Sequence, residues 1–353
     1  MRRPLIIAAL AAVVTCLTQV PAAADTQTTL TWKLSATETT AQLRGLSAIS
    51  HRVAWASGSG GTVLRTVDGG RSWQKSSPPD TGRLELRDIE AFDANTAVAM
   101  TIGEGEQSRI FRTEDGGATW RETFRNAEPT AFYDCMAFFD RRHGLALSDP
   151  VNGKFRVLST SDGGESWTAL PTTGMPDALA GEFAFAASGQ CISVAGGRDA
   201  WIATGGGAKA RVLHSRDRGR TWSAIDTVLA SGPSAGVFAT AWRDHNRGIA
   251  VGGDYAAPTN GVDALGISRD GGRSWEKPTT SPQGYRSGVT WHPFLPTTAL
   301  AVGTTGSDVT FDSGRTWHQF DSGSFDTVDC AADGACWASG AKGRVGVLRL
   351  SGH

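Results

Sequence analysis

The chain has 353 residues, of which 34 are basic and 35 acidic, so its formal net charge is −1. This balance argues against a basic nucleic-acid binder, whose domain would carry a marked excess of Lys and Arg. The 44 glycines, the 12 tryptophans and a charged fraction of 20% instead fit an all-β protein with many tight turns.

The N-terminal segment has the pattern of a secretory signal. Two arginines follow Met1, residues 5–14 form a short apolar core, and residues 22–24 are small. That core is too short for a membrane span, and no later segment is long and apolar enough for one. We therefore predict a signal peptide over residues 1–24, a secreted protein, and one mature domain over residues 25–353.

A lipoprotein is the alternative interpretation of this segment. Val13, Val14, Thr15 and Cys16 resemble a lipobox, in which Cys16 would carry the lipid anchor. Thr15 is an unusual residue before such a cysteine, so the alternative ranks second.

One eight-residue pattern occurs six times, and we call each copy a box. It has the form Ser/Thr-x-Asp-x-Gly-x-Ser/Thr-Trp and first appears as TVDGGRSW at residues 66–73. Asp and Ser/Thr side chains bond to nearby backbone in tight turns, and Gly takes the positive φ that such turns require. A β-rich run precedes each box, so each predicts a hairpin turn between two strands. The box aspartates are Asp68, Asp115, Asp162, Asp217, Asp270 and Asp312.

Each box belongs to a larger repeat of four β-runs. Two apolar runs come first, the third leads into the box, and the fourth starts at the box Trp. Successive box aspartates are 47, 47, 55, 53 and 42 residues apart. A four-stranded repeat of this length is typical of a propeller blade.

The number of blades follows from the ends of the chain. The first two runs occur seven times, but the seventh copy, residues 325–350, stops after its third run. Trp32 lies 41 residues before Trp73, about one blade, so the N-terminal run can supply the missing strand. We predict an all-β, seven-bladed β-propeller closed by residues 25–36 pairing beside 343–350, which removes exposed sheet edges.

The box resembles the Asp-box, or BNR, repeat, and the whole pattern resembles the photosystem II stability/assembly factor family of Asp-box propellers. The resemblance covers nearly all of residues 30–350. It implies that the boxes lie at the periphery of the propeller, away from its binding site, and are scaffold. It also implies binding of membrane-protein precursors by an Arg-bearing face in photosynthetic members. Nothing in this sequence indicates a photosynthetic host, so that role is not carried over.

Blade topology places a candidate site on the face opposite the boxes. In a four-stranded antiparallel blade, strand one starts and strand two ends on that face. Aligning the first strands by their distance to the second strands predicts a ring at one mouth of the central channel, held by Arg44, Arg87, Asp134, Gln190, Val237, Arg286 and Asp326. Neighbouring positions add Tyr133, Asp149, Asp254, Tyr255, Tyr285, Thr304 and Asp308. Two long loops, residues 171–189 and 254–264, are expected to wall this site.

The residue types on this face favour ligand binding. Arg can hold a carboxylate or phosphate through two hydrogen bonds, while Asp and Tyr suit sugar hydroxyls or a peptide. We predict a non-catalytic binding or assembly scaffold for a protein, peptide or glycan. We expect a monomer with no cofactor, no metal ion and no nucleic-acid partner.

The alternative is a glycan-active hydrolase, sialidase-like or another glycosidase, that uses carboxylates of the same face. Glycosidases need two carboxylates about 5–10 Å apart, and Asp134, Asp149, Asp254 and Asp326 could supply a pair. The sialidase resemblance is incomplete, because the chain lacks an Arg-Ile-Pro motif and has seven predicted blades instead of six.

Four cysteines remain after the predicted signal cleavage, and an exported protein permits disulfides. Cys330 and Cys336 flank a predicted hairpin turn, so we expect a disulfide between them. Cys135 and Cys191 hold neighbouring positions on the first strands of adjacent blades. They form either an inter-blade bridge or two buried thiols, depending on the distance between their Cα atoms.

Overall fold

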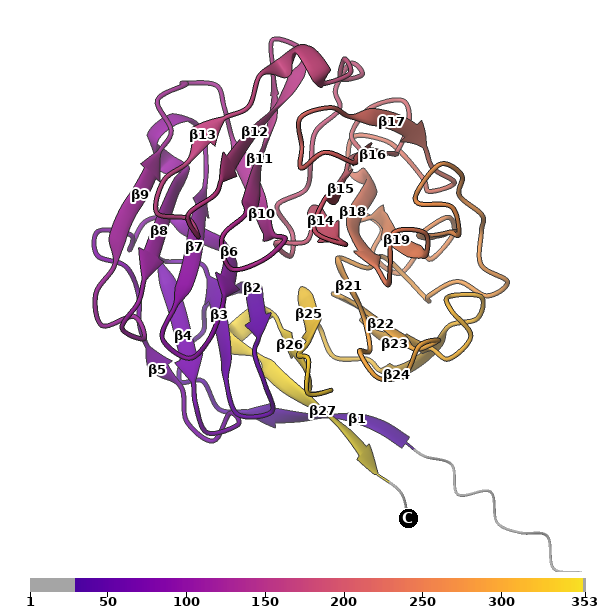
Figure 1. Ribbon diagram of the computed structural model, residues 1–353. Helices are drawn as coiled ribbons and strands as arrows, with labels where there is room; N and C mark the ends of the chain where they lie inside the picture. The colour runs from indigo at the N-terminus through magenta and orange to yellow at the C-terminus, as the bar shows by residue number, and fades with distance from the viewer. Residues whose placement is uncertain (1–28, 352–353) are drawn as a thin grey trace, which may run out of the picture.

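The computed structural model describes residues 29–351, which form seven antiparallel sheets arranged as the blades of a ring (Figure 1). The predicted seven-bladed, all-β propeller is therefore confirmed. The signal peptide predicted over residues 1–24, including Cys16, lies outside the described residues. Among the described residues, no helix is long and apolar enough to cross a membrane.

The first four blades each hold four strands in sequence order. Blade 1 comprises β2 (Leu43–Ala48), β3 (Ala54–Gly58), β4 (Thr62–Thr66) and β5 (Gln74–Lys75). Blade 2 comprises β6 (Glu85–Ala91), β7 (Ala97–Ile102), β8 (Arg109–Thr113) and β9 (Arg121–Arg125). Blade 3 comprises β10 (Tyr133–Phe138), β11 (Gly144–Val151), β12 (Lys154–Thr160) and β13 (Thr168–Ala169). Blade 4 comprises β14 (Ile192–Ala195), β15 (Asp199–Ala203), β16 (Arg211–Ser215) and β17 (Ser223–Asp226).

The last three blades depart from this plan in two places. Blade 5 holds β18 (Ala235–Trp242), β19 (Gly248–Asp254) and β20 (Leu265–Ser268). Blade 6 holds β21 (Gly288–Trp291), β22 (Ala299–Gly303), β23 (Gly306–Thr310) and β24 (His318–Asp321). Blade 7 joins β1 (Thr29–Ser35) to β27 (Val345–Ser351), β26 (Cys336–Ser339) and β25 (Thr327–Cys330). Three short 3-10 turns, η1 (Gly105–Gln107), η2 (Thr172–Gly174) and η3 (Ala341–Gly343), lie in the connections.

The two ends of the chain close the ring, as predicted. Strand β1 pairs antiparallel with β27, with Trp32 opposite Leu348, and Figure 1 shows the two lying side by side. Trp32 is buried, its ring centroid lies 5.4 Å from that of Phe325, and its indole N–H donates to Ser307 Oγ at 2.9 Å. Trp32 therefore fastens blade 7 to blade 6.

Blade 5 has no fourth strand, where the repeat predicts one. A single bridge joins Ile267 to Glu276, with the backbone N–H of each bonded to the other's carbonyl at 2.9 Å. The next bond of such a ladder requires the N–H of residue 278. That residue is Pro278, which has no N–H, so pairing stops after one bridge.

The boxes form hydrogen-bonded turns around their aspartates. Oδ1 of Asp68 accepts the backbone N–H groups of Arg71 and Ser72 at 3.0 Å, and Oδ2 accepts the Ser72 hydroxyl at 2.6 Å. These bonds lower the pKa of Asp68 to about 2, the Ser72 hydroxyl contributing most. Each box also bonds to the turn between the first two strands of its blade, as Gly69 does to Arg52. The box turns thus lie at the opposite end of the blade from the start of strand one.

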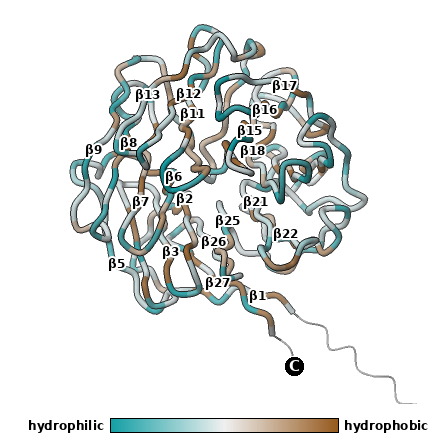
Figure 2. The backbone as a smooth tube through the Cα atoms, viewed as in Figure 1, coloured by the Kyte–Doolittle hydropathy of each residue, from teal (hydrophilic) through white to brown (hydrophobic). Residues whose placement is uncertain are grey.

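The hydrophobic core lies between neighbouring blades. Leu147 of blade 3, for example, packs in one buried cluster with Ile202 and Leu213 of blade 4. Figure 2 shows hydrophobic and hydrophilic residues interleaved along the blades, as expected when each strand alternates between a buried and an exposed side. Each blade is therefore stabilised mainly by its neighbours.

Two disulfides reinforce the ring. Cys135 on β10 bonds to Cys191, immediately before β14, with Cα atoms 5.9 Å apart. This bridge links blades 3 and 4, which settles the choice between a bridge and two thiols. Cys330 and Cys336 are bonded across the β25–β26 turn, as predicted. Two disulfides indicate an oxidising compartment.

Candidate functional site

The first strands of four blades carry a β-bulge near their start, which leaves one residue of each strand unpaired. We call the bulged position the mouth position, and Arg44, Arg87, Asp134 and Phe238 occupy it. The predicted ring placed Val237 there. That prediction was one residue off: the bulge recurs at the same distance from the second strand in all four blades, so Phe238 holds the mouth position, while Val237 pairs with Gly252 and is fully buried.

The same shift corrects the prediction for blade 6. The N–H of Ser287 bonds to the carbonyl of Val302, which is also the partner of Gly288 in the ladder. Ser287 therefore holds the mouth position, and Arg286 lies one residue earlier. Because successive side chains of a strand point to opposite sides, Arg286 turns into the protein and is fully buried.

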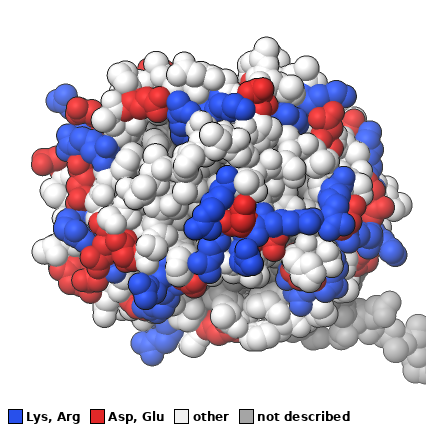
Figure 3. All heavy atoms as spheres, turned by 45° about the horizontal axis from the view of Figure 1, so that its top comes forward, with Lys and Arg blue, Asp and Glu red and all other residues white. Residues whose placement is uncertain are grey.

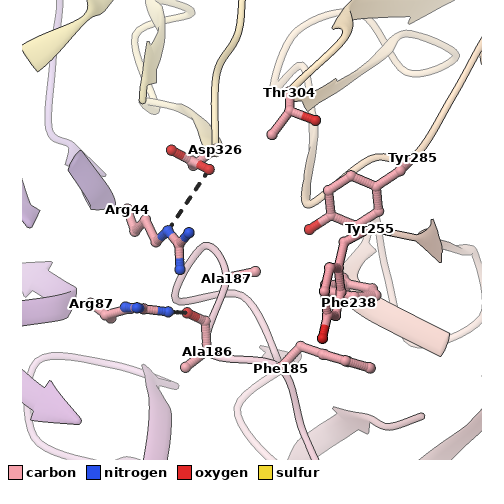
Figure 4. Close-up of a pocket in the computed structure, with 10 residues that line it drawn as sticks. All are labelled: Arg44, Arg87, Phe185, Ala186, Ala187, Phe238, Tyr255, Tyr285, Thr304 and Asp326. Carbon is pink, nitrogen blue, oxygen red and sulfur yellow. Dashed lines mark hydrogen bonds and ion pairs between the residues drawn. The ribbon is translucent and has the colours of Figure 1, made fainter. Parts of the chain in front are cut away.

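A pocket of about 360 Å³ opens on the face where the first strands begin. It is lined by Arg44, Arg87, Phe185, Ala186, Ala187, Phe238, Tyr255, Tyr285, Thr304 and Asp326 (Figure 4). We call it the mouth pocket. Both long loops contribute as expected, the first through residues 185–187 and the second through Tyr255.

One side of the mouth pocket is cationic. The side chains of Arg44 and Arg87 are 25% and 23% exposed, and Figure 4 shows both extending from the same side. Burial, together with the nearby Arg44 guanidinium, lowers the pKa of Arg87. The two guanidinium groups therefore repel one another in a partly desolvated place, an arrangement that an anion would relieve.

The counter-charges around these two arginines are incomplete. Arg44 Nε lies 3.9 Å from Asp326 Oδ1, beyond hydrogen-bond distance, and Arg87 Nε lies 3.6 Å from Glu85. Arg87 Nη1 donates to the Ala186 carbonyl at 2.9 Å, which fixes the loop beneath it. Neither Nε atom has a hydrogen-bond partner among the described residues, but both Nε atoms are buried, so a ligand can reach only the exposed part of each arginine.

The other side of the mouth pocket is aromatic. The ring of Phe238 stacks on Phe185 with centroids 3.7 Å apart and meets the edge of Tyr285 at 4.7 Å. Tyr255 stands at the rim, 53% exposed, with its ring 6.2 Å from Phe238. Figure 4 shows these rings facing the arginines across the pocket. The pocket can therefore hold an apolar group on one side and an anion on the other.

Asp326 is the acidic residue of this lining. It is buried, and the Gln42 amide donates to its two carboxylate oxygens at 3.3 and 3.2 Å. Burial raises the pKa of Asp326, while Arg44 and the Gln42 bond oppose that rise. The Asp326 carboxyl is thus engaged by the protein.

Several of the predicted site residues lie outside the mouth pocket. Tyr133 is buried with its ring 5.4 Å from Phe124, and burial raises its pKa to about 12. The carboxyls of Asp134 and Asp149 interact, and burial raises the pKa of both. Asp149 Oδ1 accepts the Ala184 N–H at 2.8 Å, so this pair supports the loop of the pocket from below. Arg286 and Asp308 form a buried ion pair, in which Nε donates to Oδ2 at 2.6 Å.

Asp254 has a structural part next to the pocket. Its Oδ1 accepts the Ser234 hydroxyl at 2.7 Å and the Ala256 N–H at 2.8 Å. These bonds hold the start of the loop that presents Tyr255. Of the predicted ligand-binding residues, the structure thus gathers Arg44, Arg87, Tyr255, Tyr285 and Asp326 around one pocket.

Three lining residues, Phe185, Ala186 and Ala187, were missed because they belong to an irregular loop with no repeat to align. The only sequence signal was the unusual length of the 171–189 connection. No group of three or more His, Cys, Asp or Glu side chains within residues 29–351 is arranged to hold a metal ion.

The fold and this pocket define a class of protein: a seven-bladed β-propeller with a ligand-sized pocket at one mouth of its ring. No family model and no curated protein matches the chain. Solved structures do match, and structures of the protein YCF48 are among them. The structure of YCF48 bound to D1 peptide has a TM-score of 0.63 at 15% identity, covering 91% of this chain and 95% of that one.

Two further solved structures extend the comparison. YCF48 from Cyanidioschyzon merolae matches with a TM-score of 0.62 at 15% identity, over 90% of this chain and 98% of that one. The Pan2 WD40 domain from Neurospora crassa matches with a TM-score of 0.58 at 15% identity, over 87% and 89%. The predicted resemblance to the photosystem II assembly factor is confirmed as a shared fold.

Proposed function

We propose that this protein is a binding scaffold that holds a peptide in the mouth pocket. The observation that carries the proposal is that two partly exposed arginines with incomplete counter-charges face four aromatic rings across one pocket. Arginine binds carboxylates in a two-pronged geometry, and aromatic rings bury apolar side chains. A peptide that presents a carboxylate next to an apolar side chain satisfies both walls.

The solved structure of YCF48 with D1 peptide supports a peptide over a glycan as the ligand. The geometry also supports binding over glycan hydrolysis, the alternative from the sequence. Hydrolysis requires two carboxyls facing one sugar. In the lining described here, Asp326 is the one acid, and Arg44 and Gln42 engage it.

The test is a peptide-binding measurement with matched ends. A library of short peptides with free C-terminal carboxylates and apolar last residues is compared by fluorescence anisotropy with the same library amidated. We expect binding of acid-ended peptides and at least about ten-fold weaker binding by the Arg44→Ala/Arg87→Ala variant, because each charged hydrogen bond contributes about 1.5–3 kcal/mol. Arg83→Ala, an exposed arginine outside the pocket, is the matched control.

Three outcomes would contradict this function. The first is that the Arg44→Ala/Arg87→Ala variant binds the peptides as tightly as the unmodified protein. The second is that no peptide of the library binds. The third is that the unmodified protein hydrolyses a glycan and the variant does not. The last would restore the hydrolase alternative. Tyr255→Ala should weaken binding of both the acid-ended and the amidated peptides, since Tyr255 stands on the aromatic side and contacts the apolar last residue that both share.

We further propose that the protein acts outside the cytoplasm, exported by the signal peptide predicted over residues 1–24. The two disulfides support an oxidising compartment. N-terminal sequencing of the protein from the native host should find a chain starting at Asp25. A mature protein that retains a lipid on Cys16 would establish the lipoprotein alternative instead.

A further inference from the structure

A second cavity lies at the box end of the molecule, between blades 4 and 5. It measures about 400 Å³ and is lined by His214, Arg216, Thr221, Trp222, Ser223, Ile225, Gly272 and Arg273. We call it the box pocket. It is built mainly by the boxes of two adjacent blades, and it shares no lining residue with the mouth pocket.

The six repeats supply an internal comparison for this pocket. The corresponding place between blades 2 and 3 holds Arg112 where the box pocket has His214. It holds Glu114 at the position of Arg216, Arg121 at that of Ser223, and Glu165 at that of Arg273. Between blades 2 and 3 the charges cancel: Arg112 Nη1 lies 2.6 Å from Glu114 and 3.7 Å from Glu165, and Arg121 Nη2 lies 3.3 Å from Glu165.

In the box pocket both carboxylates of that arrangement are replaced by arginines. Neither the Arg216 nor the Arg273 side chain forms an ion pair or a hydrogen bond with another residue of the described chain. The neighbouring box acids are occupied, since Asp217 accepts the Thr221 hydroxyl and Asp270 the Ser274 hydroxyl, each at 2.6 Å. Figure 3 shows acidic and basic side chains lying together around much of the edge of the visible face, with a group of mainly basic side chains near its centre.

The floor of the box pocket is rigid. His214 is buried, its Nε2 lies 2.9 Å from Asp199 Oδ1, and its ring stacks on Trp201 at 4.6 Å. Trp201 in turn stacks on Trp242 at 3.9 Å. Burial, opposed by Asp199 and reinforced by the two arginines, lowers the pKa of His214. The pocket thus holds two unpaired cations next to an imidazole that Asp199 and Trp201 hold in place.

We propose that the box pocket binds a phosphate or sulfate group, with Arg216 and Arg273 as its ligands. The charges are inverted relative to blades 2 and 3: there Glu114 and Glu165 hold the Arg112 and Arg121 cations, and here the smaller His214 and Ser223 leave room for a tetrahedral oxyanion between Arg216 and Arg273. Each guanidinium group can bind it through two hydrogen bonds. The cavity is in the size range of small-molecule sites. The cavity is also lined by hydroxyl and apolar side chains, so it can hold a sugar that carries the phosphate or sulfate as a monoester.

The test measures binding of named oxyanions by isothermal titration calorimetry at low ionic strength. The probes are inorganic phosphate, inorganic sulfate, glucose 6-phosphate and glucose 6-sulfate, with glucose as the uncharged control. We expect the oxyanions to bind and glucose not to bind. Monoesters that bind more tightly than the inorganic ions indicate a sugar-borne group, whereas equal affinities indicate the free ion, and both support the site.

The decisive variant is Arg216→Glu/Arg273→Glu, which reproduces the acids found between blades 2 and 3. We expect it to fold and to bind the oxyanions at least about ten-fold more weakly, because two charge-assisted contacts are lost. The control is Arg71→Glu/Arg315→Glu, which makes the same charge change at two other exposed box positions and should leave the affinity unchanged.

The milder Arg216→Gln/Arg273→Gln variant keeps the test informative should the reversed charges impair folding. A shift of the His214 ring resonances on adding phosphate to the unmodified protein provides a local readout. The proposal is overturned by an absence of oxyanion binding, by unchanged affinity in the Arg216/Arg273 variants, or by an equal loss in the Arg71/Arg315 control.

Discussion

Arg286 and Asp308 show how one ion pair can support a binding site without lining it. The two side chains are 0% and 1% exposed, the most buried ion pair of the described residues. Arg286 Nη1 also donates to the carbonyl of Tyr285 and to the Thr305 hydroxyl, each at 2.8 Å. Arg286 therefore positions the backbone that carries Tyr285 in the mouth pocket.

Removing one partner of this pair should destabilise the protein more than removing both. Arg286→Met leaves the Asp308 carboxylate buried without its cation, which typically costs about 3–5 kcal/mol. In the Arg286→Met/Asp308→Leu double variant, we expect most of that loss to be recovered, since no charge remains to be desolvated. Urea unfolding of the two single variants and the double variant measures the coupling. Additive losses would show that the pair is not coupled.

The Asp134 and Asp149 carboxyls should make stability fall as the pH rises. Burial is the main cause that raises their folded pKa values, to about 7 for Asp149 and well above the usual value for Asp134. An unfolded aspartate loses its proton near pH 4, so between about pH 4 and pH 7 the folded state holds more protons than the unfolded one. The free energy of unfolding contributed by this pair therefore decreases with pH across that window.

Asp134→Asn isolates this contribution, because it removes one titrating carboxyl and little volume. Urea unfolding between about pH 5 and pH 8 should give a shallower dependence for the variant than for the unmodified protein. The box aspartates do not interfere, since their pKa values are lowered, to about 2 for Asp68, so they titrate below this range. Identical slopes would argue against a protonated pair.

At the scale of elements, the two disulfides close loops of very different length. Cys135 and Cys191 are 56 residues apart and join two blades, whereas Cys330 and Cys336 are 6 apart within one hairpin. Because a longer closed loop restricts the unfolded chain more, the first bridge should contribute about 4 kcal/mol and the second about 2. Thermal unfolding of the two Cys→Ala double variants checks the order, and a larger loss for the hairpin bridge would contradict it.

The boundary between what was predictable and what was not also lies at the scale of elements. The boxes repeat because every blade needs the same turn, so the ring and its closure could be predicted from spacing. The bulge recurs in four blades but carries no recurring residue type, and in blade 5 the mouth position was predicted one residue too early, at Val237 instead of Phe238. Phe185 reaches the pocket from a loop that no repeat constrains. Four of the ten lining residues, Phe185, Ala186, Ala187 and Phe238, were therefore not predicted from the repeat.

At the scale of the whole molecule, stability depends on closing the ring, and Trp32 is the residue that tests this. Trp32 is 7% exposed and packs between Phe320 and Phe325. Trp32→Ala should cost about 3–5 kcal/mol, since a large cavity opens where the two ends of the chain meet. Leu34→Ala, on the same strand but 51% exposed, should change stability by less than about 0.5 kcal/mol. Urea unfolding of both variants separates the two cases, and equal, small losses would show that the ring does not depend on β1.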